Sequence, residues 1–194
     1  AYICDVTKKM DVKKTITSII NTFGQINLVI CNAGGTIPIK ALYCSSSIKK
    51  NFELNVFGLT HLIEFTLPFL KVQAKKQQLA QLVYISSNAA FLPISYLGVY
   101  SATKKASEFL LTALRRELRH ENIDISIISP GYIKTNMTKK SYEDKSLNSA
   151  RQKHMLIKRW GDPEDIANVI SFFCSDKSSY CLLYTSDAAD ESVS

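Results

Sequence analysis

Short apolar runs alternate with longer amphipathic segments along most of the chain, and this alternation constrains the fold more than any other feature. Runs rich in β-branched residues cover Ile26–Cys31, Leu82–Ile85 and Ile123–Ile128. All three are short, and the run at Ile26–Cys31 in particular is typical of a strand covered on both faces of a parallel sheet. Tyr2–Cys4 has a similar composition and is predicted to be the end of a further strand.

The segments between these runs carry apolar residues at helical spacing. Predicted helices cover residues Met10–Phe23, Ser46–Leu70, Gly98–His120 and Pro163–Cys174. Strands and helices in alternation predict an α/β fold, a doubly wound parallel sheet with helices on both faces. Ligands of such sheets bind beyond the carboxyl ends of the strands. We therefore expect chemistry in the turns after Cys31, Ile85 and Ser129.

Length and composition fit one ordinary globular domain. The chain has 194 residues, of which 46% are apolar and 21% charged, and no apolar run reaches the roughly 18 residues of a membrane-spanning helix. Five cysteines and three histidines show no metal-binding spacing, which predicts a reduced, intracellular and cytoplasmic protein without a metal site. The net charge of +7 is compatible with nucleic-acid binding, but the lysines are dispersed. A solvated basic surface is the better interpretation.

Tyr100 and Lys104 stand at positions i and i+4 of a predicted helix and therefore share one face. A nearby ammonium group favours a phenolate and lowers the pKa of a tyrosine, which makes Tyr100 a candidate general acid or base. The spacing alone equally fits an exposed helical pair.

Three further segments give this pair a context. Ser87 follows a predicted strand, where it is either a site residue or a turn cap. Asn32–Gly34 also end a strand, and their small side chains allow a ligand to approach the backbone. Asn55 is a polar residue inside an apolar helix, so its amide either faces a wet site or bonds a neighbouring backbone.

Six short motifs occur in a fixed order along the chain. They are C-D-V at 4–6, N-A-G at 32–34, L-N-V-x-G at 54–58, I-S-S at 85–87, Y-S-A-T-K at 100–104 and S-P-G-Y-I-K-T at 129–135. In this order and spacing they resemble the short-chain dehydrogenase/reductase family over about Tyr2 to Tyr180. Arg159–Ala167 is similar to a segment of its 3-oxoacyl-carrier-protein reductase branch.

The resemblance implies an oxidoreductase that transfers a hydride between the nicotinamide of NAD or NADP and a carbonyl/alcohol substrate. Tyr100 would be the general acid or base, and Lys104 would hold the nicotinamide ribose and lower the tyrosine pKa. Ser87 would polarise the substrate oxygen, and Asn55 would hold a water of a proton relay.

The resemblance also implies a set of cofactor contacts. Adenine would lie against Asp5 and Val6, the adenosine ribose against residues 32–34, and the nicotinamide end against a loop over residues 130–135. The implied contacts along the whole cofactor are Asp5, Val6, Asn32, Ala33, Gly34, Asn55, Tyr100, Lys104, Pro130, Gly131, Ile133 and Thr135.

The chain departs from the family pattern at both ends. The phosphate-binding loop T-G-x-x-x-G-x-G is absent, which predicts an incomplete Rossmann-like sheet without its first two strands and its last strand. The expected organisation is a partial dinucleotide-binding domain over residues 1–180 and a non-native tail over 181–194. We expect this chain to fold poorly and to be inactive, because an uncovered apolar sheet edge favours aggregation, while the parent protein is an enzyme.

Several alternatives stay open at this stage. A dinucleotide-binding regulator on the same scaffold would bind cofactor without turnover. The basic segment Asn136–Lys158 fits either an acidic carrier, such as acyl-carrier protein or a coenzyme A thioester, or a solvated amphipathic lid. Leu92, Tyr96 and Leu97 are candidate pocket walls. The family often pairs its two long helices into a dimer or tetramer. The apolar face that would serve such a homo-oligomer, or the subunit's own sheet, comprises Leu110, Leu111, Leu114 and Leu118.

Overall fold

The computed structural model describes residues 1–36, 45–92, 97–153 and 155–178. The chain divides into two compact units, one built mainly from residues 1–129 and one from residues 130–181. The predicted single domain over 1–180 stays a prediction, and the predicted tail at 181–194 lies outside the described residues.

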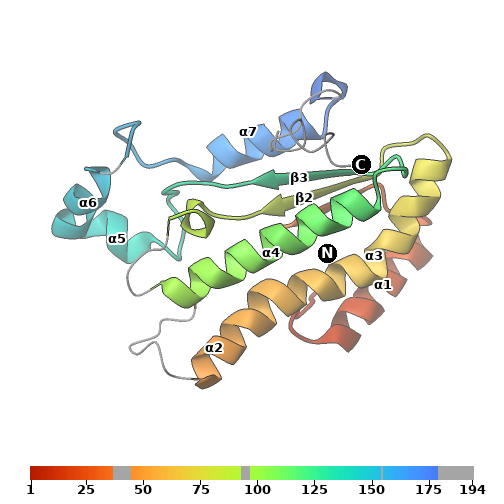
Figure 1. The fold of residues 1–194 in the computed structure, drawn as a ribbon, viewed down its shortest axis with the longest axis horizontal. Coiled ribbons are helices and arrows are strands. Elements are labelled where there is room, and N and C mark those ends of the chain that lie inside the picture. The colour runs from red at the N-terminus through yellow and green to blue at the C-terminus, as the bar shows by residue number, and fades with distance from the viewer. Residues whose placement is uncertain (37–44, 93–96, 154, 179–194) are drawn as a thin grey trace, which may run out of the picture. The chain divides into compact units, whose positions relative to one another are not determined.

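The first unit contains a parallel three-stranded sheet (Figure 1). Its strands are β1 (Leu28–Cys31), β2 (Gln81–Ile85) and β3 (Asp124–Ile128), in the order β1-β2-β3. Cys31 of β1 is opposite Tyr84 of β2, and Ile85 is opposite Ile128 of β3. All three carboxyl ends therefore meet at one edge of the sheet, as predicted for an α/β fold.

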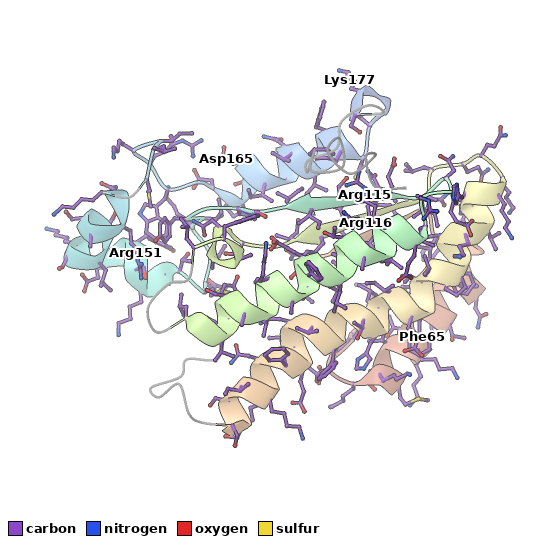
Figure 2. All side chains as sticks on the ribbon, in the orientation of Figure 1. Phe65, Arg115, Arg116, Arg151, Asp165 and Lys177 are labelled. Atoms are coloured by element: carbon purple, nitrogen blue, oxygen red, sulfur yellow. The ribbon has the colours of Figure 1, made fainter. Side chains whose placement is uncertain are left out.

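Three helices of this unit are α1 (Lys9–Phe23), α3 (Gly58–Lys75) and α4 (Gly98–Glu117). Helix α3 contacts β1, α4 contacts β3, and α1 contacts α3; Figure 1 shows α3 and α4 crossing the same side of the sheet. The Lys9 ammonium nitrogen lies 2.7 Å from Glu64 Oε1 and 5.8 Å from the ring centroid of Phe65, which is labelled in Figure 2. This pairing fastens the start of α1 to the middle of α3.

The long helix predicted over Ser46–Leu70 is not one regular helix. Helix α2 (Ser45–Phe52) passes into a π turn at Glu53–Phe57 and then into α3. The N–H of Gly58 donates to the carbonyl of Glu53, five residues back, so this turn holds one residue more than an α-helical turn. A Cβ built on Gly58 would lie 2.9 Å from Val6 Cγ2, so the chain requires glycine where it leaves the π turn.

Two strand predictions need correction. Tyr2–Cys4 forms no strand, because no described residue pairs with its backbone, and Ile3 is fully exposed. Strand β1 was expected to be covered on both faces. Instead Val29 and Cys31 are buried while Ile30 is 43% exposed, whereas the central strand β2 is buried along most of its length.

The core of the first unit lies between the sheet and helices α3 and α4. Leu70, Leu82 and Leu111 are its most buried leucines, each at most 1% exposed. Leu118 is also buried in this core, and the partly buried Leu114 packs against the core, whereas Leu110 is 45% exposed. The subunit's own sheet therefore uses most of the leucine face of α4.

The second unit contains α5 (Lys139–Glu143), α6 (Lys145–Gln152), α7 (Pro163–Phe173) and a 3₁₀ turn at Asp176–Ser178. Trp160 is its buried centre, with Tyr132 and Tyr142 at ring-centroid distances of 5.4 and 5.8 Å. The indole N–H donates to Asn148 Oδ1 at 3.0 Å. An aromatic cluster thus joins the loop after Pro130 to α5 and α6.

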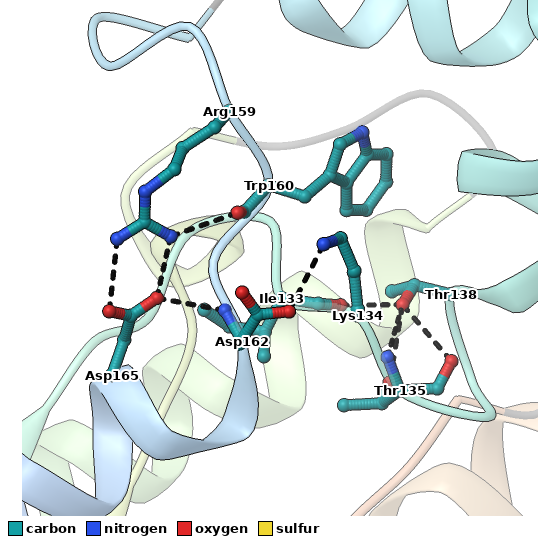
Figure 3. Close-up of polar contacts among 8 residues, drawn as sticks. All are labelled: Ile133, Lys134, Thr135, Thr138, Arg159, Trp160, Asp162 and Asp165. Carbon is teal, nitrogen blue, oxygen red and sulfur yellow. Dashed lines mark hydrogen bonds and ion pairs between the residues drawn. The ribbon is translucent and has the colours of Figure 1, made fainter.

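Polar contacts hold the start of α7 to the same loop (Figure 3). Arg159 makes two hydrogen bonds to the Asp165 carboxylate, at 2.7 and 3.0 Å, and that carboxylate also accepts from the N–H of Asp162 at 2.8 Å. Lys134 pairs with Asp162 at 3.1 Å. The Arg159 guanidinium lowers the pKa of Asp165 to about 2.

Replacing Leu111 by Ala tests the core. Leu111 is fully buried, so Leu111→Ala is expected to lower the free energy of unfolding by about 2–5 kcal/mol, because it leaves a cavity. Leu110→Ala on the exposed side of the same helix is the matched control, with an expected change within about 0.5 kcal/mol. Urea unfolding monitored by circular dichroism measures both. Equal losses in the two variants would contradict the assignment of the core face.

Candidate active site

The carboxyl edge of the sheet gathers the turns that follow the three strands. Residues 32–35 follow β1, Ser86 and Ser87 follow β2, and Ser129 follows β3. The Ser86 N–H donates to the carbonyl of Ile128 at 2.7 Å, so the pairing of β2 with β3 continues into the turn. Helix α4 contacts the 3₁₀ turn Asn88–Ala90 beyond Ser87.

Asn55 ties the turn after β1 to helix α4. Its side-chain oxygen accepts from the N–H of Gly35 at 2.9 Å, and its Nδ2 donates to the carbonyl of Gly35 at 2.9 Å and to Thr103 Oγ1 at 3.0 Å. Of the two interpretations of this buried amide, bonding to a neighbouring backbone is therefore confirmed. The main-chain oxygen of Asn55 accepts from Ser107 Oγ at 3.0 Å.

Lys104 is a lysine buried inside the unit, with only 4% of its surface exposed. Its Nζ donates to the carbonyl of Ile85 at 2.8 Å and lies 4.9 Å from the ring centroid of Tyr84. Burial lowers the pKa of Lys104 to about 8, and the charge of Glu108 opposes this effect. A Cβ built on Gly34 would lie 3.2 Å from Lys104 Nζ and 3.1 Å from Asn55 Oδ1, so glycine lets the backbone of this turn pass close to both groups.

Tyr100 and Ser87 lie together at the start of α4. Lys104 Nζ is 5.9 Å from the ring centroid of Tyr100. Burial raises the pKa of Tyr100, and a hydrogen bond to Ser87 opposes the rise. The sequence had predicted a lowered tyrosine pKa. The structure differs because burial desolvates the phenol, and this effect outweighs the hydrogen bond to Ser87. Ser87 Oγ also accepts from the N–H of Ala89 at 3.2 Å, so this residue caps a turn as well.

Sequence reasoning missed three buried residues of this site. Thr103 and Ser107 are fully buried on α4, and Tyr84 is buried on β2 beneath the Lys104 ammonium. Thr103 Oγ1 donates to the carbonyl of Tyr100 at 2.7 Å while it accepts from Asn55. The sequence did contain a signal for two of these residues, because Thr103 and Ser107 are four residues apart and therefore share one face of helix α4.

The remaining predicted contacts are spread over both units. In the first unit, exposed Asp5 bonds the backbone and hydroxyl of Thr7, and the carbonyl of Val6 is 3.0 Å from His61 Nδ1. Asn32 and Ala33 are exposed after β1. The predicted nicotinamide-loop residues, Pro130, Gly131, Ile133 and Thr135, all belong to the second unit.

In that loop the carbonyl of Ile133 accepts from Thr138 Oγ1, and the backbone of Lys134 pairs with that of Gly161. A Cβ built on Gly161 would lie 2.5 Å from Ile133 Cδ1, so a larger residue there would require the end of the Ile133 side chain to move.

Other predicted features have simple outcomes. Leu92 is 69% exposed, and Tyr96 lies outside the described residues. Cys31 is buried, which raises the pKa of its thiol to about 12 and fits a packing role. Among the described residues, His, Cys, Asp and Glu form no group of three suited to a metal ion. In the same part of the chain, no helix has the length and apolar composition to cross a bilayer.

Comparison with known proteins connects this geometry to a family. The profile of a family described as Enoyl-(Acyl carrier protein) reductase matches residues 1–183. The chain is 30% identical to "Dehydrogenase/reductase SDR family member 4" of Oryctolagus cuniculus, covering 92% of this chain and 68% of the relative. It is 29% identical to "Dehydrogenase/reductase SDR family member 2, mitochondrial" of Homo sapiens, covering 92% and 62%.

A solved structure extends the comparison. A 7α-hydroxysteroid dehydrogenase in complex with NADH and 7-oxo glycochenodeoxycholic acid has a TM-score of 0.83 and 27% identity, covering 92% of this chain and 68% of that one. The chain thus spans 62–68% of the length of these three relatives.

The buried ammonium group leads to a prediction about pH and stability. Because the pKa of Lys104 is about 8 in the folded chain and 10.5 ordinarily, the unfolded state binds the proton more tightly between these values. Proton binding therefore favours the unfolded state, and this effect is lost as the pH rises through the window. The free energy of unfolding of wild type thus increases relative to that of Lys104→Met, by at most about 1.4 kcal/mol per pH unit.

Urea unfolding of both proteins at pH 7.5–10.5 would measure this difference, at intervals of about half a pH unit. The other buried titrating groups, such as Cys31 and Tyr84, are common to both proteins and cancel. A stability difference independent of pH would show that Lys104 is not desolvated.

Proposed function

The chain belongs to the short-chain dehydrogenase/reductase family, and on that premise we propose that the whole protein reduces or oxidises a carbonyl/alcohol pair with NAD or NADP. The observation that carries this proposal is the buried Lys104 ammonium beside Tyr100 at the carboxyl edge of the sheet. A lysine that served only solubility would lie in water, because burying a charged group is costly.

The site also fits the nicotinamide half of the cofactor. Glycine at position 34 lets the backbone of the turn after β1 pass close to two polar groups, since a Cβ there would lie 3.1 Å from Asn55 Oδ1 and 3.2 Å from Lys104 Nζ. Lys104 and Tyr100 would hold the nicotinamide ribose, and residues 32–34 would line the adenosine ribose. When bound, the cofactor supplies or accepts the hydride.

Tyr100 provides the proton. Because burial raises its pKa, the phenol keeps its proton at neutral pH, which suits donation to the oxygen of a carbonyl substrate. The Lys104 charge, 5.9 Å from the ring centroid, stabilises the phenolate left behind. The Ser87 hydroxyl, which already bonds Tyr100, orients the substrate oxygen. Asn55 would hold the turn after β1 in place and support proton return to Lys104.

The substrate class is proposed more coarsely. The steroid dehydrogenase relative binds a ketone, which supports a small carbonyl compound as the substrate of this protein. A carrier-bound acyl group is the alternative suggested by the description of the matching family. The basic residues of α5 and α6 would favour it, although Lys139 already lies 3.8 Å from Glu143.

We further propose that the whole protein is a homo-oligomer. On α4, Phe109 and Leu110 are 74% and 45% exposed, while Leu111 faces the core. Phe57 at the end of the π turn is 50% exposed. Large exposed apolar side chains on the two long helices fit a subunit contact better than a solvated surface.

Tyr100→Phe tests the proposed reaction. The variant removes only the hydroxyl group, so kcat is expected to fall by about 10²–10⁴-fold while cofactor still binds. Tyr2→Phe is the matched control, because it removes the hydroxyl group of an exposed tyrosine. Among the described residues, the hydrogen-bond partner of the Tyr2 hydroxyl is Thr22 Oγ1, at 3.0 Å. The assay follows NAD(P)H absorbance in the full-length protein with a panel of ketones and alcohols.

The same assay separates an enzyme from a dinucleotide-binding regulator. A regulator would bind NAD(P)H without turnover of any ketone or alcohol, in wild type and in Tyr100→Phe alike. Sequencing the coding region beyond both ends of the chain adds an independent test, because the enzyme requires a strand followed by T-G-x-x-x-G-x-G for the pyrophosphate.

A further inference from the structure

We propose that Glu108 is a positioning residue of this site, whose buried carboxylate holds the charge of Lys104 and joins the carboxyl ends of β2 and β3 through Ser86 and Ser129. The catalytic part of this inference rests on the proposed function. The structural part stands on the contacts of Glu108 itself, which neither the motifs nor the resemblance had identified.

Helical spacing places Glu108 on the same face of α4 as the two candidate catalytic residues. It follows Lys104 by four positions and Tyr100 by eight, which are one and about two turns of an α-helix. Only 6% of its surface is exposed. Acidic side chains are rarely buried to this extent unless they are paired or hydrogen-bonded.

The hydrogen bonds of Glu108 reach two strand ends. Its Oε1 accepts from Ser86 Oγ at 2.6 Å and from Ser129 Oγ at 3.2 Å. Ser86 directly precedes Ser87, and Ser129 directly precedes Pro130. One carboxylate therefore fixes the residues from which the catalytic serine and the predicted nicotinamide loop continue.

The charge of Glu108 acts on two lysines in different surroundings. Oε2 lies 3.6 Å from Nζ of Lys105, a lysine whose side chain is 52% exposed. Lys104 is buried, and the negative charge of Glu108 favours its ammonium form. An ion pair at the surface, such as that of Glu108 with exposed Lys105, contributes little to stability. A charge near a desolvated ammonium group, in contrast, changes the proton affinity of that group strongly.

The other titratable groups around Lys104 do not supply this charge. Tyr84 of β2 and Tyr100 of α4 are the phenols near its ammonium group, and Cys31 of β1 lies next to Tyr84 in the sheet. Burial raises the pKa of all three groups, so they stay neutral at neutral pH. Asn55 is an uncharged amide. Glu108 is thus the negative group among the described residues that keeps Lys104 protonated.

Glu108→Gln tests this role because it removes the charge and keeps the shape and a hydrogen-bond acceptor. The protonation of Lys104 is followed by NMR of ¹³C-labelled lysine side chains in the full-length protein without cofactor, and Lys104→Arg assigns the signal. The wild-type titration midpoint near pH 8 is expected to fall by about one pH unit in Glu108→Gln. Glu117→Gln, near the end of the same helix, is the matched control and leaves the midpoint unchanged.

An unchanged Lys104 midpoint in Glu108→Gln would overturn the proposal. If that variant does not fold, Glu108→Asp keeps the charge but withdraws it by one methylene, and a smaller downward shift is expected. No shift in Glu108→Asp would then count against the proposal in the same way.

The activity readout is kept separate. In an active enzyme, kcat/KM falls at high pH when Lys104 loses its proton, since catalysis needs the ammonium form. In Glu108→Gln this alkaline limb moves to lower pH together with the titration midpoint of Lys104. If wild type turns over no carbonyl or alcohol, the proposed function fails, while the lysine titration still decides the role of Glu108.

Discussion

The structure of the first unit depends on the burial of one ammonium group. A desolvated Lys104 is costly, and the fold offsets this cost with the carbonyl of Ile85, the ring of Tyr84 and the charge of Glu108. Each of these groups sits on β2 or α4, so the register between strand and helix is specified by the polar group as well as by the leucines. Any shift of α4 along the sheet would move Lys104 away from its two partners on β2, the carbonyl of Ile85 and the ring of Tyr84.

The sequence predicted the parallel sheet because short apolar runs leave few other arrangements. It also predicted the juxtaposition of Asn55, Ser87, Tyr100 and Lys104, through motifs that end strands or share one helix face. The roles of these residues stay predictions. It failed at Tyr2–Cys4, since a short apolar run becomes a strand only where a neighbour accepts its hydrogen bonds. The composition of a run gives its side chains but does not show whether a neighbouring strand is present.

The pKa of Tyr100 shows a second limit of sequence reasoning. Spacing correctly placed a cation one turn from the phenol, yet the direction of the pKa shift depends on how much water the phenol loses and on its hydrogen bond to Ser87. Both are properties of the packed site. The contacts of Glu108 were hidden for the same reason: its serine partners, Ser86 and Ser129, are separated from it by more than 20 residues in each direction.

The π turn at Glu53–Phe57 has a consequence for how this region tolerates insertions and deletions. The extra residue puts α2 and α3 out of phase, with the amide of Asn55 aimed at the turn after β1. Deleting one residue here would let the segment close into regular α-helical turns, and the remaining residues of the turn would take new positions. A change that improves local helix geometry would thus separate Asn55 from Gly35.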